Sequence, residues 1–135
     1  MIIDAHNHPD WGGHNLDRFV QNMARYNIDR SWLLTWECPA DEYSPSEYNH
    51  GVLSGAWGPI SFTRVLSYGE RAPSKFVLGY APDPRHPEAI DRLQAAIDLY
   101  GVRLYGELKL RMMYDNPDAL RMFRFCGEKG LPVTV

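Results

Sequence analysis

The sequence predicts an α/β fold built on a parallel sheet, and three observations support this prediction. Short apolar runs of strand character alternate with amphipathic helical segments along all 135 residues. Such alternation is typical of right-handed βαβ units. The length suffices for one domain with one modest core, and a composition of 44% hydrophobic and 23% charged residues is that of a globular protein.

Residues 1–36 predict a first unit of strand, helix and strand. An apolar run opens the chain and ends at residue 8, and residues 28–36, with the run Ser-Trp-Leu-Leu-Thr-Trp, predict a second buried strand. Between them, residues 15–27 predict a helix with Asn15 as its N-cap. The apolar side chains of this helix follow the i, i+3, i+4, i+7 spacing of one stripe: Leu16, Phe19, Val20 and Met23.

The rest of the chain continues the alternation after an unusually long connection over 37–58. The predicted elements are a helix over 60–71, a strand over 75–81, a helix over 84–100, a strand over 102–110, a helix from 116 to 127 or 130, and a strand over 131–135. The helix over 84–100 has the most regular apolar stripe, and Gly101 follows it as a stop.

Two histidines stand together at the end of the first strand. Strand alternation puts His6 and His8 on one side, about 7 Å apart along the backbone, and Asn7 on the other. Imidazole nitrogens bind a divalent ion at about 2.0 to 2.1 Å, so two side chains of one face can reach the same ion. Surface histidines near a chain end give the same pattern, but the preceding apolar strand and the polar turn after Pro9 favour a ligand pair.

The segment Ile2-Ile3-Asp4-Ala5-His6-Asn7-His8-Pro9 resembles the opening strand of the amidohydrolase superfamily, in its amidohydrolase-related branch of metal-dependent hydrolases and decarboxylases. The resemblance implies a (β/α)8 TIM barrel in which His6 and His8 bind metal. Residues 1–135 would form the N-terminal portion of a single such domain, a partial barrel with about the first five strands. The family's remaining ligands, two histidines and an aspartate that would be the general base, are expected beyond Val135.

The resemblance also draws attention to the predicted fourth strand, which contains Glu107 and Lys109. Both side chains can face the barrel interior beside the histidines, and in relatives with two metals this strand supplies a bridging glutamate or carboxylated lysine. Two interpretations stay open: a metal ligand or catalytic group, with Glu107 preferred over Lys109, and a Glu-Lys ion pair that orients the site. Asp4, by alternation on the same face as the histidines, is expected to support the ligands without binding metal.

The long connection after the second strand has the aromatic content of a binding loop. In a parallel barrel it lies on the same face as the histidines. Trp36, Glu37 and His50 are therefore the candidate substrate-binding residues, because aromatic walls with a few polar groups are usual in small-molecule sites. Trp57 is expected to anchor the loop.

Charge and composition narrow the class of partner. A net charge of −3 without a basic block predicts binding neither to nucleic acid nor to a membrane surface. There is no membrane-spanning run and no signal peptide pattern, and Cys38 and Cys126 have no redox or metal spacing, so we expect a cytoplasmic protein with reduced thiols. A sheet of five strands would leave an open edge that favours aggregation or a homo-oligomer.

The function implied by the resemblance is hydrolysis of a small amide, ester or lactone-like substrate through a metal-activated water. The cofactor would be a divalent ion, zinc first, with manganese and iron as alternatives. Non-oxidative decarboxylation of an aromatic or unsaturated acid is the alternative within the family. A fragment or interaction module without catalysis is the alternative outside it.

Overall fold

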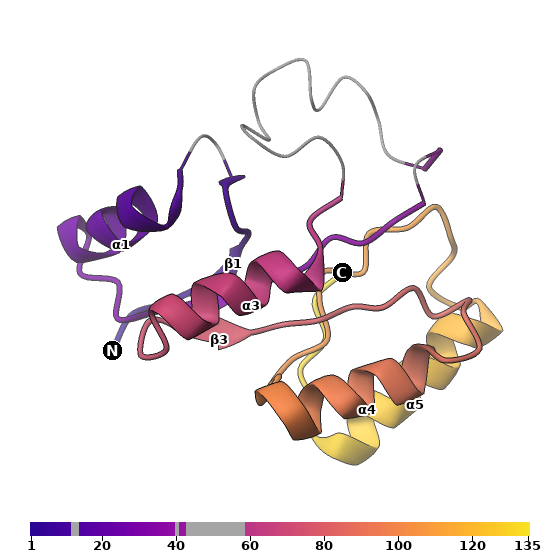
Figure 1. Ribbon diagram of the computed structural model, residues 1–135. Coiled ribbons are helices and arrows are strands. Elements are labelled where there is room, and N and C mark those ends of the chain that lie inside the picture. Colours follow the sequence, from indigo (N-terminus) through magenta and orange to yellow (C-terminus); the bar gives the residue numbers. More distant parts are fainter. Residues whose placement is uncertain (12–13, 40, 43–58) are drawn as a thin grey trace.

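The computed structural model describes residues 1–11, 14–39, 41–42 and 59–135 (Figure 1). Its sheet has three parallel strands in chain order: β1 (Ile3–Asn7), β2 (Arg30–Leu33) and β3 (Phe76–Leu78). The helices in the described part of the chain are α1 (Leu16–Arg25), α3 (Phe62–Arg71), α4 (Ala89–Tyr100) and α5 (Pro117–Lys129). The predicted alternation and the parallel sheet are therefore confirmed.

The last two predicted strands are present only as single bridges. Leu104 pairs with Gly79 and Val133 pairs with Tyr105, both in the parallel sense, so the chain order of the sheet continues beyond β3. The prediction of regular strands over 102–110 and 131–135 was wrong, and β2 and β3 are shorter than predicted. The reason is that the fourth segment changes partner: Arg103 N donates to Leu78 O at 3.0 Å at the end of β3, and Glu107 N then donates to Thr35 O at 2.8 Å, in the chain after β2.

The helix ends follow local chemistry. Asn15 caps α1 as predicted, with its side chain accepting from Arg18 N at 3.0 Å. Gly101 and Gly130 close α4 and α5 with left-handed φ angles of 68° and 66°. The helix predicted from residue 84 begins only at Ala89, because residues 83–88 form turns.

Two core clusters hold the helices against the sheet. One packs α1 and α3 on β2 and β3 through Leu16, Phe19, Met23, Leu33, Val65, Tyr68 and Phe76. The other surrounds the pair of helices α4 and α5, which lie side by side in Figure 1, and includes Leu93, Ala96, Tyr105, Leu108, Met122 and Cys126. Both clusters hold the strands and the segments after them in place.

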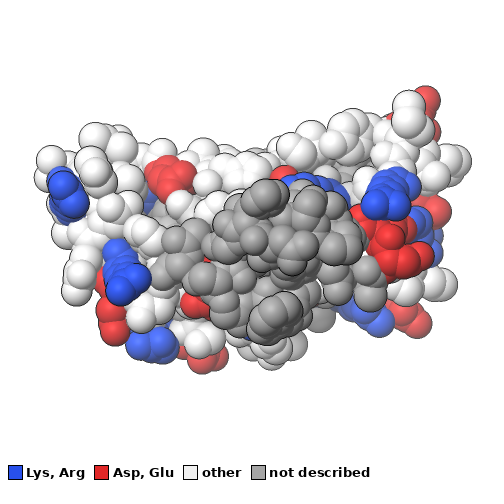
Figure 2. All heavy atoms as spheres, turned by 90° about the horizontal axis from the view of Figure 1, so that it is seen from above, with Lys and Arg blue, Asp and Glu red and all other residues white. Residues whose placement is uncertain are grey.

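The surface carries charges of both signs. Acidic and basic side chains occur together near both ends of the face shown in Figure 2. None of the helices in the described ranges is long and apolar enough to cross a membrane.

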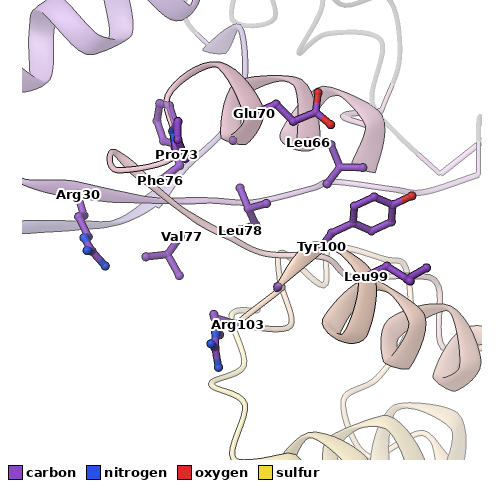
Figure 3. A pocket seen from close by; sticks show the side chains of 12 residues that line it. Arg30, Leu66, Glu70, Pro73, Phe76, Val77, Leu78, Leu99, Tyr100 and Arg103 are labelled. Carbon is purple, nitrogen blue, oxygen red and sulfur yellow. The ribbon is translucent and has the colours of Figure 1, made fainter.

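A hollow of about 440 Å³ lies where the strands begin, between α3 and α4 (Figure 3). Its lining includes Arg30, Phe76, Tyr100 and Arg103. His6 and His8 lie at the other end of the strands, so this hollow belongs to a different face from the candidate site.

Candidate metal centre

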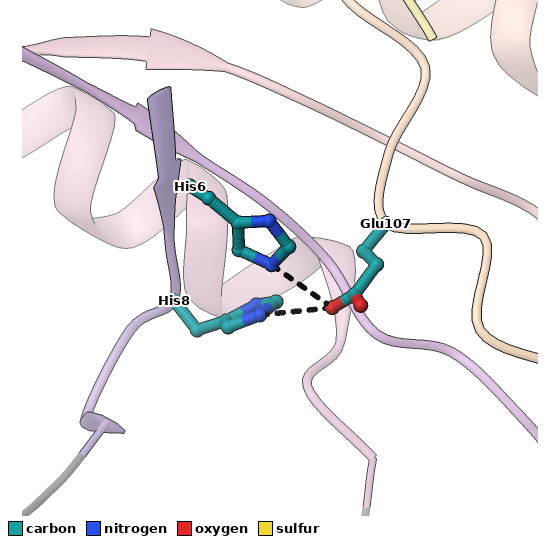
Figure 4. A group of neighbouring side chains, drawn as sticks. All are labelled: His6, His8 and Glu107. Carbon is teal, nitrogen blue, oxygen red and sulfur yellow. Dashed lines mark hydrogen bonds and ion pairs between the residues drawn. The ribbon is translucent and has the colours of Figure 1, made fainter. Parts of the chain in front are cut away.

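The carboxyl end of the sheet brings three potential ligands together (Figure 4). The Nε2 atoms of His6 and His8 lie 3.3 Å and 3.1 Å from the same oxygen, Oε2 of Glu107. All three ligand atoms lie within 4.8 Å of one another, and no other such group of three is found in the described ranges. Residues far apart in the sequence thus meet at the end of the sheet where strand alternation placed them.

His8 is held in one orientation by a second contact. Its side chain is almost fully buried, and its Nδ1 lies 2.9 Å from the carbonyl oxygen of Leu34, just after β2. A carbonyl can only accept, so Nδ1 carries a proton. Nε2 can then donate to Glu107 when the ring is charged, and it offers a lone pair to a metal ion when the ring is neutral. Ligating histidines in metal proteins are oriented in this way.

Glu107 is ionised by its surroundings. Burial by itself would raise the pKa of Glu107, but the hydrogen bond to His8 and the charges of His8, His6 and Lys109 lower it, and the net shift is downward. The backbone just before Glu107 packs closely against Thr134: a Cβ added at Gly106 would lie 2.9 Å from the Cβ of Thr134, so this position has no room for a side chain. The surroundings of Glu107 therefore favour its carboxylate form beside the two imidazoles.

Asp4 does not share a face with the histidines, and this prediction was wrong. The register of β1 shifts between Asp4 and Asn7, which breaks the simple alternation. Asp4 instead accepts hydrogen bonds from Asn7 Nδ2 at 2.8 Å and Ser31 Oγ at 3.4 Å. It supports β1 from the side of α1, in keeping with the structural role expected for it.

Lys109 lines the same hollow as the three candidate ligands. This hollow of about 230 Å³ is bounded by His6, Asn7, His8, Trp11, Glu107 and Lys109. No ion pair joins Glu107 to Lys109, both of which the structure describes; the Lys109 ammonium lies 4.2 Å from the centroid of the Trp36 ring. A direct ion pair between the two is therefore not formed, although the charge of Lys109 contributes to the lowered pKa of Glu107.

The proposed substrate-binding residues lie apart from this hollow. Trp36 is 3% exposed, pairs with Ile60 and is part of a small core cluster. Glu37 accepts from the backbone N–H of Phe62 at 2.9 Å, at the start of α3, and lines a separate hollow with Asp83 and Arg92. Burial raises the pKa of Glu37, and the bond from Phe62 and the charge of Arg92 offset this only in part.

Substrate contact by Trp36 or Glu37 stays a prediction. Trp36 does not line the hollow of the candidate metal centre, but its ring lies against the Lys109 ammonium, which does. His50 and Trp57 lie outside the described residues.

Sequence reasoning indicated a polar turn after Pro9 but missed the contacts that this turn makes. Asp10 has a left-handed φ of 60°, and its carboxylate accepts from the Tyr68 hydroxyl at 2.7 Å. The turn places the Trp11 ring 5.1 Å from the ring of His8. The partner of Asp10 is 58 positions away, so no local pattern could have revealed this contact.

Sequence reasoning also missed a cluster of charged side chains, because its members are far apart in the sequence. Arg85 binds Asp83 and Glu42, each at 2.6 Å, and the other oxygen of Glu42 accepts from Arg111 N at 2.9 Å. These contacts join the segments that follow β2, β3 and the bridged residues Leu104 and Tyr105.

Comparisons with known proteins show which solved structures the fold resembles. No protein-family model and no curated protein matches the chain. An uncharacterised TIM-barrel protein from Bordetella bronchiseptica superposes with a TM-score of 0.60 at 21% identity, over 98% of this chain and 53% of that one. A probable 2-pyrone-4,6-dicarboxylic acid hydrolase from Acinetobacter baumannii, with citric acid bound, gives a TM-score of 0.58 at 12% identity, over 98% and 48%.

These likenesses are informative about fold alone. The chain spans about half the length of the solved structures it matches. Its strands and helices therefore correspond to part of a TIM barrel, as expected.

Proposed function

We propose that the chain is part of a metal-dependent hydrolase of the amidohydrolase type that acts on a small amide, ester or lactone-like substrate. The observation that supports this most is the meeting of His6, His8 and Glu107 at the carboxyl end of a parallel sheet. In TIM barrels this end is where active sites are built. The activity proposed is that of the whole protein.

The donor set fits a divalent ion. Two imidazole nitrogens and a carboxylate form the three-ligand arrangement of catalytic zinc sites, which leave one position for water. Bonds of about 2.0 to 2.1 Å in tetrahedral geometry require donors roughly 3.4 Å apart. The distances of 3.3 Å and 3.1 Å from the Nε2 atoms to Glu107 are close to this value, and all three donor atoms lie within 4.8 Å of one another. Zinc is the first choice, with manganese and iron as alternatives.

Each residue has a distinct task in this proposal. A bound ion would lower the pKa of its water toward 7 and polarise the substrate oxygen. His8, fixed by Leu34, presents Nε2 without rearrangement, and the ionised Glu107 is the third ligand or orients the histidines.

The test is zinc binding measured by calorimetry, with bound metal counted by elemental analysis. We expect His6→Ala combined with His8→Ala to weaken zinc binding by 100-fold or more, because two of three donors are lost. The matched control is His86→Ala, since His86 is an exposed histidine outside the cluster. Zinc bound equally well by the double variant and the control would refute the metal-dependent hydrolase.

A further inference from the structure

We propose that Lys109 binds a carboxylate of the substrate, so that the protein acts on small esters, lactones or amides that carry a carboxylate group. The substrate class rests on the proposed function, whereas the contact between Lys109 and an anion can be tested without it.

The first argument is the charge of the hollow. Among the described residues that line it, Lys109 is the only lysine or arginine. The Glu107 carboxylate directs Oε2 at both imidazoles, at 3.3 Å and 3.1 Å, and does not pair with the ammonium. Among the described residues the ammonium therefore forms no direct ion pair, although its charge helps to lower the pKa of Glu107.

The second argument is the position of the ammonium. It lies 4.2 Å from the centroid of Trp36, and Trp36 is itself held in the core by its pairing with Ile60. A cation placed over an aromatic face is held by the ring's quadrupole, which restrains a long and flexible side chain. The described residues offer no hydrogen-bond acceptor to its three N–H donors, so these donors are available to a ligand.

The third argument is the shape of the site. A hollow of about 230 Å³ is small for an organic ligand, so a compact molecule that touches Lys109 also approaches His6, His8 and Glu107. A carboxylate would accept charge-assisted hydrogen bonds from the ammonium, as lysines commonly provide. The reacting carbonyl at the other end of such a molecule would then face the candidate ligands.

Glutarate and its neutral diamide, glutaramide, are the matched probes. We would titrate each by calorimetry into the protein with and without zinc. We expect glutarate to bind, Lys109→Met to weaken it by about 10-fold or more, and Lys109→Arg to restore it. Glutaramide should bind weakly and be insensitive to Lys109→Met, because it lacks the charge.

The control variant is Lys129→Met. Lys129 also places its ammonium over an aromatic ring, 5.6 Å from the centroid of Phe125, but it lies on α5 and does not line the hollow. Glutarate bound equally well by Lys109→Met and Lys129→Met, or not bound by the unmodified protein, would overturn the inference. Loss of glutarate binding in Lys109→Met together with no zinc binding would keep the anion contact and reject the hydrolase.

Discussion

At the scale of single residues, the two histidines differ in how firmly they are placed. His8 is 4% exposed and contacts Leu34, Glu107 and the ring of Trp11. The side chain of His6 is 47% exposed and contacts Glu107 and the edge of His8. The proposed ligand role therefore rests on a buried, structural side chain in one case and on an accessible one in the other.

We expect alanine at these positions to separate stability from metal binding. His8→Ala should lower the free energy of unfolding of the metal-free protein by about 1 to 3 kcal/mol, because it leaves the Leu34 carbonyl unpaired and opens a cavity. His6→Ala should change it by less than about 0.5 kcal/mol, while both weaken zinc binding. Urea unfolding with chelator present measures the difference, and equal losses for the two variants would contradict this account.

Glu37 gives a pH-dependent prediction. Its pKa is raised above the ordinary value of 4.5, mainly by burial, so the folded protein holds this proton more tightly than the unfolded chain does. The stability gained from the protonated form is complete below about pH 4.5 and is lost as pH rises through the raised pKa. Glu37→Gln keeps an oxygen to accept from Phe62 and removes the charge, so it should raise the melting temperature at pH 7.

The control for Glu37→Gln is to measure its gain in melting temperature at several pH values. The gain in melting temperature should shrink toward zero as the pH is lowered to 4.5 or below, because wild-type Glu37 is then protonated as well. A gain that does not depend on pH would show that burial of the charge is not its cause.

At the scale of elements, glycines mark positions with different backbone needs. Gly101 ends α4 with φ at 68°, a conformation that side chains disfavour. Gly127 lies within α5, and no φ in the left-handed range is found there. At both positions an added Cβ would meet nothing within 4 Å, so backbone conformation alone distinguishes them.

Alanine at these two glycines should act in opposite directions. Gly101→Ala should destabilise the protein by about 1 to 2 kcal/mol, because it forces a side chain into the left-handed region. Gly127→Ala should stabilise it by up to about 1 kcal/mol, because alanine favours a helix interior more than glycine does. Chemical denaturation compares the pair, and a loss of stability at both would contradict the backbone argument.

At the scale of the whole molecule, the sheet is open. Apolar side chains are exposed near both of its edges: Ile2 at 54%, Ile3 at 43%, Val133 at 39% and Val135 at 53%. Strand edges of this kind pair with other chains unless they are covered. In a TIM barrel the two edges are joined by further strands.

We therefore expect the 135-residue chain to self-associate as its concentration rises. Ile3→Lys combined with Val133→Lys should reduce the association, because a charge on an edge opposes strand pairing. Leu99→Lys is the control, since Leu99 is 72% exposed on α4, away from the sheet edges. Light scattering after gel filtration gives the mass; a monomer at all concentrations, or equal effects of the variants and the control, would refute this prediction.

The sequence by itself determined the chain order of strands and helices, the cap at Asn15 and the stop at Gly101. These features depend on apolar periodicity and on side-chain or backbone chemistry within a few residues. It also predicted that His6 and His8 point to a common place with Glu107 near them, because the carboxyl ends of parallel strands meet on one face.

Only the tertiary structure decided how these parts combine. The register shift in β1 turns Asp4 away from the histidines, and the pairing of Glu107 with Thr35 draws the fourth segment out of a regular strand. The contact of Lys109 with Trp36, and not with Glu107, depends on where two distant backbones approach. Such choices depend on packing between segments many tens of residues apart, which periodicity along the chain does not encode.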